Sequence, residues 1–219
     1  MNSEWSQLNK TMQLQLKKKE TFDNGIETLL TLRRSLMEQI VEFRNILTAE
    51  DFSAMPYMNA SGYHNKTIAY SLYHVFRIED IVANTLISGS PQIFFTGDYK
   101  DRLNSPIITT GNELVKHEIA DFSAKLNIDE LYNYISDVDK STAHLLKNLS
   151  FSDMKTKMTE QDKDNIRSLK VVSEDENAVW LIDYWCGKNI QGLLQMPFSR
   201  HWIMHTEAAL RIADKLTAK

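Results

Sequence analysis

The chain has 219 residues, of which 42% are hydrophobic and 25% charged, and its formal net charge is −4. This composition is typical of a globular protein with its own core, and the lack of a long basic run argues against nucleic-acid binding. Only 7 glycines and 4 prolines are present, which argues against an all-β protein with many tight turns and favours an all-α fold.

The first segment, residues 4–20, is polar and is expected to form an extra N-terminal helix. It lacks the apolar core of a signal peptide, and no part of the chain approaches the roughly 18 consecutive apolar residues of a membrane span. The single cysteine, Cys186, excludes an intrachain disulfide. We therefore expect a cytoplasmic protein that does not bind a membrane.

Residues 22–47 show the clearest helical periodicity in the N-terminal half of the chain. Their apolar side chains recur at intervals of three and four, which predicts one buried helical face. Arg33 and Arg34 fall off this stripe. Gly25 suggests a break between this helix and the one before it.

A loop is expected over 48–62, followed by a second long helix over 63–88 that ends at the sequence "GSP". Residues 92–109 show no regular pattern. Two shorter helices are predicted at about 111–126 and 128–149 from their apolar spacing.

Residues 150–176 are polar and weakly patterned, as in a long surface excursion, with a short strand expected at "SLKVV" (168–172). The last two helices are expected at about 175–195 and 198–217, with Pro197 separating them. Several long amphipathic helices joined by short links predict a single helical-bundle domain spanning residues 1–219.

Two histidines stand four apart in the last predicted helix, within "HWIMH". In a helix, His201 and His205 lie on one face, one turn apart, and can share a divalent ion. His74 lies beside the apolar stripe of the helix predicted over 63–88 and can supply a third nitrogen. Three protein ligands with an open position are the arrangement that metals use for catalysis.

The ordinary alternative is that these are three core histidines, since HxxxH occurs often in helices without a metal. The general-base Glu of an HExxH metalloprotease is absent, because Trp202 follows His201. His74 completes the set only if the two helices are adjacent. His64, His117 and His144 are expected near the surface.

The segments "NKTIAYSLYHVFRIEDIVANTL" (65–86) and "MPFSRHWIMHTEAALRI" (196–212) resemble the DinB-like superfamily, which includes the YfiT-like metal-dependent hydrolases and the thiol S-transferases. The family pattern has one His in the second core helix, matched by His74, and an HxxxH in the last, matched by His201 and His205. The chain departs from the pattern in its N-terminal stretch and in the excursion at 150–176, so the substrate is not carried over.

This resemblance implies a four-helix bundle with up-down-down-up connectivity. It also implies a divalent metal, zinc or nickel with iron as a further option, held by His74, His201 and His205. A low-molecular-weight thiol is a possible cofactor, and a homodimer is expected.

Several residues near this set carry two interpretations each. Arg77 is either a binding residue for an anionic cofactor group or the partner of Glu79 or Asp80 in an ion pair. Asp183 is either an acceptor for a ligand imidazole or an ion-pair partner. Tyr70 is a proton donor or packs in the core. The tryptophans Trp180, Trp185 and Trp202 line a pocket mouth or the core.

We therefore predict a metal-dependent enzyme that activates water or a thiol for hydrolysis or S-transfer on a small-molecule substrate. The alternative is a non-enzymatic, stress-related helical-bundle binding protein with a vestigial histidine site. A third hypothesis places a nucleophile at Cys186.

Overall fold

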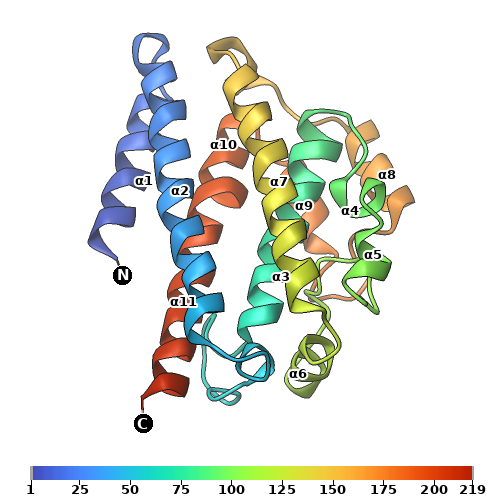
Figure 1. The fold of residues 1–219 in the computed structure, drawn as a ribbon. Helices are drawn as coiled ribbons and strands as arrows, with labels where there is room; N and C mark the ends of the chain where they lie inside the picture. Colours follow the sequence, from blue (N-terminus) through green and yellow to red (C-terminus); the bar gives the residue numbers. More distant parts are fainter. Residues whose placement is uncertain (1, 219) are drawn as a thin grey trace.

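The computed structural model describes residues 2–218, and every regular element in that range is a helix (Figure 1). The single β-type pairing among these residues is a bridge between Lys157 and Asn189. The elements in chain order are α1 (Ser3–Gln15), η1 (Lys19–Thr21), α2 (Phe22–Ile46), η2 (Asp51–Ser53), α3 (Ile68–Asp80), η3 (Ile81–Ile87), α4 (Ile93–Thr96), α5 (Tyr99–Arg102), α6 (His117–Ser123), α7 (Ile128–Asn148), η4 (Phe151–Lys155), α8 (Glu160–Leu169), α9 (Trp180–Cys186), α10 (Ile190–Gln195), η5 (Met196–Arg200) and α11 (His201–Thr217). The all-α prediction is therefore confirmed.

The long helices lie lengthwise beside one another, and Figure 1 shows their directions. α2 and the continuous helix α10–η5–α11 run one way along the molecule, whereas α3 with η3 and α7 run the opposite way. α3 packs against both α7 and α11, and α11 also packs against α2. Side chains of α3 therefore face α11, which is the juxtaposition that the three-histidine hypothesis requires.

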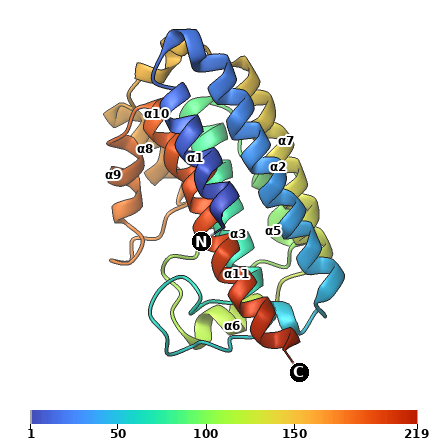
Figure 2. The same ribbon diagram turned by 90° about the vertical axis from the view of Figure 1, so that its left-hand side faces the viewer.

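The N-terminal helix is an addition that packs along α2 (Figure 2). The predicted break at Gly25 is wrong, because Gly25 lies inside α2 and the chain turns at residues 16–21. A Cβ at Gly25 would lie 2.8 Å from Leu16 Cδ2, so the glycine allows the chain to approach α2 closely. Trp5 of α1 is buried and donates its indole N–H to Ser35 Oγ at 2.9 Å.

Several predicted boundaries shift beyond residue 62. The helix predicted over 63–88 begins at residue 68, where Thr67 caps it by accepting from the Tyr70 N–H. The helix predicted over 111–126 covers only α6. No strand forms at 168–172, since α8 runs to Leu169 and the chain then turns through Lys170 at φ 54°.

The helix predicted over 175–195 is two helices, α9 and α10, and the cap of α10 is Asn189, which accepts from the Gly192 N–H. Pro197 does not separate two helices. It lies within η5, a π-helical segment that joins α10 to α11 without a break. Pro197 is therefore seven residues after the first residue of this continuous helix, Ile190, where a proline removes one hydrogen bond and crowds the preceding turn, and the helix is wider, with π-type bonding, at this position.

Two clusters of buried apolar side chains fill the interior, and both histidine-bearing helices pass from one to the other near the imidazoles. On α3, Val75 belongs to the first cluster and Ile78 to the second; around His201, Phe198 belongs to the second cluster and Trp202 to the first. The histidines therefore interrupt the apolar interior where the clusters meet.

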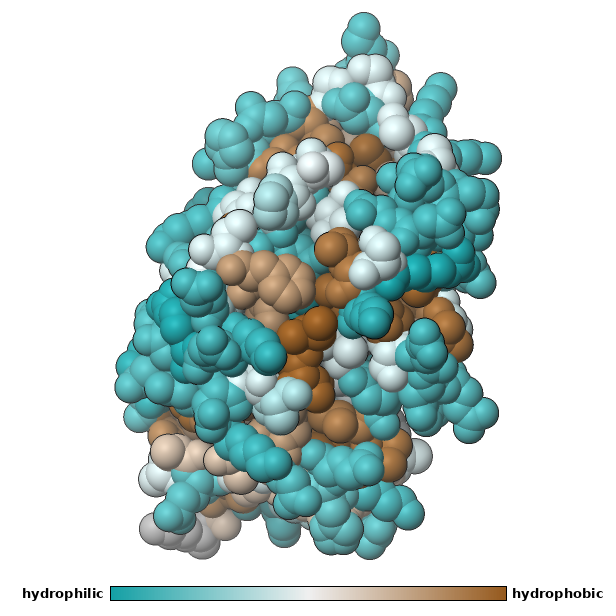
Figure 3. All heavy atoms as spheres, turned by 90° about the vertical axis from the view of Figure 1, so that its right-hand side faces the viewer, coloured by the Kyte–Doolittle hydropathy of each residue, from teal (hydrophilic) through white to brown (hydrophobic). Residues whose placement is uncertain are grey.

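The face on the side of α5 and α8 is mostly hydrophilic, and apolar residues reach its surface in a narrow central band (Figure 3). No helix among residues 2–218 is long and apolar enough to cross a membrane.

Candidate metal centre

The three histidines singled out by the sequence come together in the interior. His74 Nε2 lies 3.2 Å from His201 Nε2, and the ring centroids of His201 and His205 are 4.6 Å apart. One ring nitrogen from each of the three lies within 4.8 Å of the others, and all three residues are buried. The expected adjacency of the two helices is therefore present.

Both helices carry a π-helical segment next to the site. η3 continues α3 beyond Asp80, and η5 leads directly into His201, the first residue of α11. Such segments widen one turn of a helix and often occur at functional sites.

The protonation of the imidazoles follows from their surroundings. The Thr110 carbonyl lies 2.9 Å from His74 Nδ1 and accepts a hydrogen bond from its N–H, which leaves a lone pair on the Nε2 that faces His201. Burial lowers the pKa of His74 from about 6.5 to about 4. Burial, with a smaller effect of the neighbouring imidazoles, also holds the pKa values of His201 and His205 well below that of a free imidazole. All three rings are therefore neutral near pH 7.

Three of the six ring nitrogens are buried without a hydrogen-bond partner in the part of the chain that the structure describes. They are His201 Nδ1, His205 Nδ1 and His205 Nε2. Buried polar atoms are normally paired. A neutral imidazole has a proton on one nitrogen and a lone pair on the other, so His201 and His205 can each offer one nitrogen to a divalent transition-metal ion.

A row of backbone carbonyls holds the face of α3 that carries His74. Tyr70 donates to the Gly111 carbonyl at 3.0 Å, Tyr73 to that of Thr109 at 3.0 Å, and Arg77 to that of Ile108 at 2.8 Å. With the bond to His74, residues 70, 73, 74 and 77 engage four consecutive carbonyls. The Tyr70 ring also stacks on His74 at 5.5 Å, so packing and backbone bonding describe its role.

Little in the amino-acid pattern indicates this carbonyl row. Gly111, at φ 77°, was its one visible signal, because a left-handed turn favours glycine.

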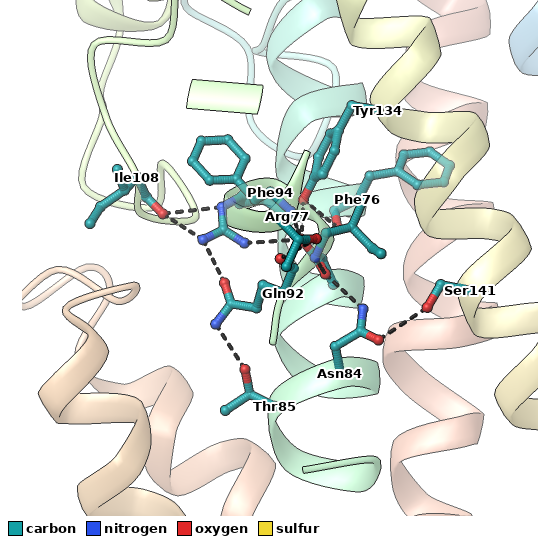
Figure 4. Close-up of polar contacts among 12 residues, drawn as sticks. Phe76, Arg77, Asn84, Thr85, Gln92, Phe94, Ile108, Tyr134 and Ser141 are labelled. Carbon is teal, nitrogen blue, oxygen red and sulfur yellow. Dashed lines mark hydrogen bonds and ion pairs between the residues drawn. The ribbon is translucent and has the colours of Figure 1, made fainter. Parts of the chain in front are cut away.

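Arg77 is fully buried in a polar network next to the row (Figure 4). Its guanidinium lies 3.6 Å from Asp80, donates to Gln92 Oε1 at 2.8 Å and stacks 4.2 Å from the Phe94 ring. Asp80 also accepts from Tyr134 at 2.9 Å. These contacts match the ion-pair interpretation, and Arg77 does not line the cavity beside the imidazoles.

Arg33 is buried, although it lies off the apolar stripe predicted for its helix. Its guanidinium bonds Glu79 of α3 at 2.7 and 2.8 Å and Asp139 of α7 at 2.6 Å. Trp202 of α11 donates to Glu79 at 2.7 Å, and its ring lies 4.2 Å from the guanidinium. We call Arg33, Glu79, Asp139 and Trp202 the clamp, because they tie both histidine-bearing helices to α2 and α7.

A cavity of about 380 Å³ opens beside His74 and His201. Trp180 and Trp185 line it, as one interpretation of the tryptophans predicted, whereas Trp202 lies in the clamp. The remaining lining residues are Tyr63, Ile78, Asn112, Leu181, Tyr184, Met196 and Pro197.

The other residues considered in the sequence lie outside the site. Asp183 is exposed and pairs with Lys163 at 3.1 Å, so its predicted contact with an imidazole is wrong. His117 and His144 are exposed as expected. Cys186 is buried, and burial raises the pKa of its thiol to about 11, which disfavours a nucleophilic thiolate.

No protein-family model matches the chain, and no curated protein matches it.

Proposed function

We propose that this chain is a metal-dependent enzyme of the DinB-like type, in which His74, His201 and His205 hold a divalent ion, with zinc or nickel preferred and iron as a further option. The observation that carries the proposal is the meeting of three buried, neutral imidazoles whose ligand atoms lie within 4.8 Å of one another. The orphaned nitrogens of His201 and His205 support a ligand role over a packing role.

The residues of the chain account for the properties of such a site. The Thr110 carbonyl fixes the His74 tautomer, and the stacked Tyr70 ring restrains the imidazole plane. When bound, a divalent ion would supply a Lewis-acidic centre that lowers the pKa of a water or a thiol. Three protein ligands beside a cavity favour a catalytic centre over a closed structural one.

The helix directions support a four-helix bundle of the DinB-like type. α2 and α11 run opposite to α3 and α7, which is the order expected for up-down-down-up connectivity. In this proposal α1, α8 and α9 are additions around the bundle, and α9 supplies one wall of the cavity.

Metal content is the direct test. Protein purified without a His tag or chelators should contain close to one ion per chain, and His205→Ala should lose it. His144→Ala is the matched control, because His144 is exposed and remote from the site. Substoichiometric metal that is unchanged in His205→Ala would contradict the proposal.

A thermal-shift titration with Zn²⁺ or Ni²⁺ gives a second measurement. An ion at 100 times its Kd that binds only the folded chain adds about 2.7 kcal/mol of stability. Unchanged melting temperatures up to millimolar metal would favour the non-enzymatic binding protein. Turnover is then assayed on electrophilic substrates with water alone and with a low-molecular-weight thiol.

A further inference from the structure

The cavity beside the imidazoles has two unlike sides. His74, His201, Tyr63 and Asn112 give it a polar end. The remaining wall is apolar and largely aromatic, and it comes from α9, from Ile78 on α3 and from the η5 segment. A molecule that reaches the imidazoles with one end must therefore lay its other end against aromatic side chains.

No Lys, Arg, Asp or Glu is among the residues that line the cavity. Of the nearby charged groups, Asp183 is exposed and pairs with Lys163, and Lys188 does not line the cavity but its Nζ lies 4.1 Å from the ring centroid of the lining residue Tyr184. A charged group placed in the cavity would lose water without gaining a counterion.

Trp180 marks the outer end of the aromatic wall. Its side chain is 49% exposed, while its indole N–H donates to the Asn177 carbonyl at 2.9 Å, which fixes the ring. The ring meets Tyr184 edge-on, with centroids 5.6 Å apart. A preformed, half-open aromatic surface of this kind gains burial when a flat apolar group covers it.

We infer that this cavity selects substrates whose non-reacting portion is uncharged and aromatic or otherwise apolar, and that Trp180 is a specificity-determining residue. The inference rests on the proposed function only in taking the reacting end of the substrate to lie at the imidazoles. It disfavours a substrate or cofactor that lays an anionic tail against the aromatic wall, because no Lys or Arg side chain lines the cavity.

Two probes with nearly the same skeleton test the inference. N-phenyl-1-naphthylamine is neutral, and 8-anilinonaphthalene-1-sulfonate adds one negative charge; the fluorescence of both rises in apolar surroundings. Binding is titrated on the full chain, once after chelator treatment and once with zinc. Because the chelated protein is measured separately, failure of metal binding does not decide the result.

The neutral probe should bind the chelated protein with a Kd about tenfold lower than that of the sulfonated probe. Trp180→Ala should weaken the neutral probe at least about threefold. Val179→Ala is the matched control, because Val179 is its exposed neighbour and does not line the cavity. Tyr184→Ala provides a second wall variant should Trp180→Ala fold poorly.

Equal or tighter binding of the sulfonated probe would overturn the inference, as would unchanged binding of the neutral probe in both wall variants. Either result, together with one zinc per chain, would leave the proposed metal centre standing and refute only the substrate class. The expected preference for the neutral probe, together with no zinc binding, would support the substrate class and contradict the proposed metal centre.

Discussion

Removing the charge of Glu79 is expected to destabilise the fold strongly, because Glu79 is the centre of the clamp. Its carboxylate receives two hydrogen bonds from Arg33 and one from the Trp202 indole. Glu79→Gln keeps the size of the side chain but presents an amide to a guanidinium that has only donors. The change therefore leaves a buried cation facing a group that cannot neutralise it.

The magnitude follows from burial. The Arg33 and Glu79 side chains are 2% and 0% exposed, and removing one partner of a buried pair costs about 3–5 kcal/mol. Arg33 keeps Asp139, whose side chain is 30% exposed, so we expect a loss near the lower end, about 3 kcal/mol. That is a large part of the roughly 5–15 kcal/mol of a typical domain.

A double-mutant cycle in urea separates the pair from its surroundings. Arg33→Met should cost a similar amount, and the double variant should cost less than the sum by at least about 1 kcal/mol, since neither charge is left alone. The exposed pair Arg44–Asp129 is the control, where neutralisation should cost under about 1 kcal/mol. Additive single changes, or a Glu79→Gln protein as stable as the parent, would refute the reasoning.

Three further outcomes are expected. The metal-free chain should lose stability as the pH falls from about 6.5 to about 4, because in this range His74 is protonated in the unfolded chain but stays neutral in the folded one. The pKa difference of His74 alone corresponds to about 3 kcal/mol of unfolding free energy. Denaturation at pH 7 and at pH 4.5 should therefore show a smaller loss of stability in His74→Gln than in the parent chain. Gly111→Ala should lower the melting temperature more than Gly89→Ala. Both glycines have positive φ, so alanine costs about 1–2 kcal/mol of stability at either position. Only at Gly111 would the added Cβ also come within 3.1 Å of the Tyr70 ring. Cys186→Ser should retain any metal-dependent activity, and its loss in a folded variant would restore the thiol nucleophile hypothesis.

The long helices were predictable because their signals are local. α2 and α7 differ from the predicted ranges by a residue or two, since each carries an apolar stripe over many turns, and Asn127 caps α7 by accepting from the Glu130 N–H. The last helix was found for the same reason, although its continuity through Pro197 was not. Proline usually breaks or kinks a helix in its interior, and sequence alone did not show that the helix would continue through Pro197 as a π-helical segment.

Errors occurred where partners are far apart in the chain. Arg33 lies off the apolar stripe of its own helix, so the pattern of that helix does not indicate its burial. The burial depends on Glu79, 46 positions later, and on Asp139, 106 positions later. The carbonyl row at 108–111 was missed for a related reason. Any residue can present a backbone carbonyl, so the contact that fixes the His74 tautomer has no side-chain signature.

The strongest distinction between a metal centre and three core histidines is the pattern of unpaired nitrogens. A structural histidine is buried because its ring packs and its nitrogens find partners, whereas His205 is buried with neither nitrogen paired. Each unpaired buried group costs about 1–3 kcal/mol, so the cluster weakens the metal-free fold. His205→Leu should therefore stabilise the chelated protein while abolishing its response to zinc. A core histidine would give the opposite result, because replacing it would break bonds that hold the fold together.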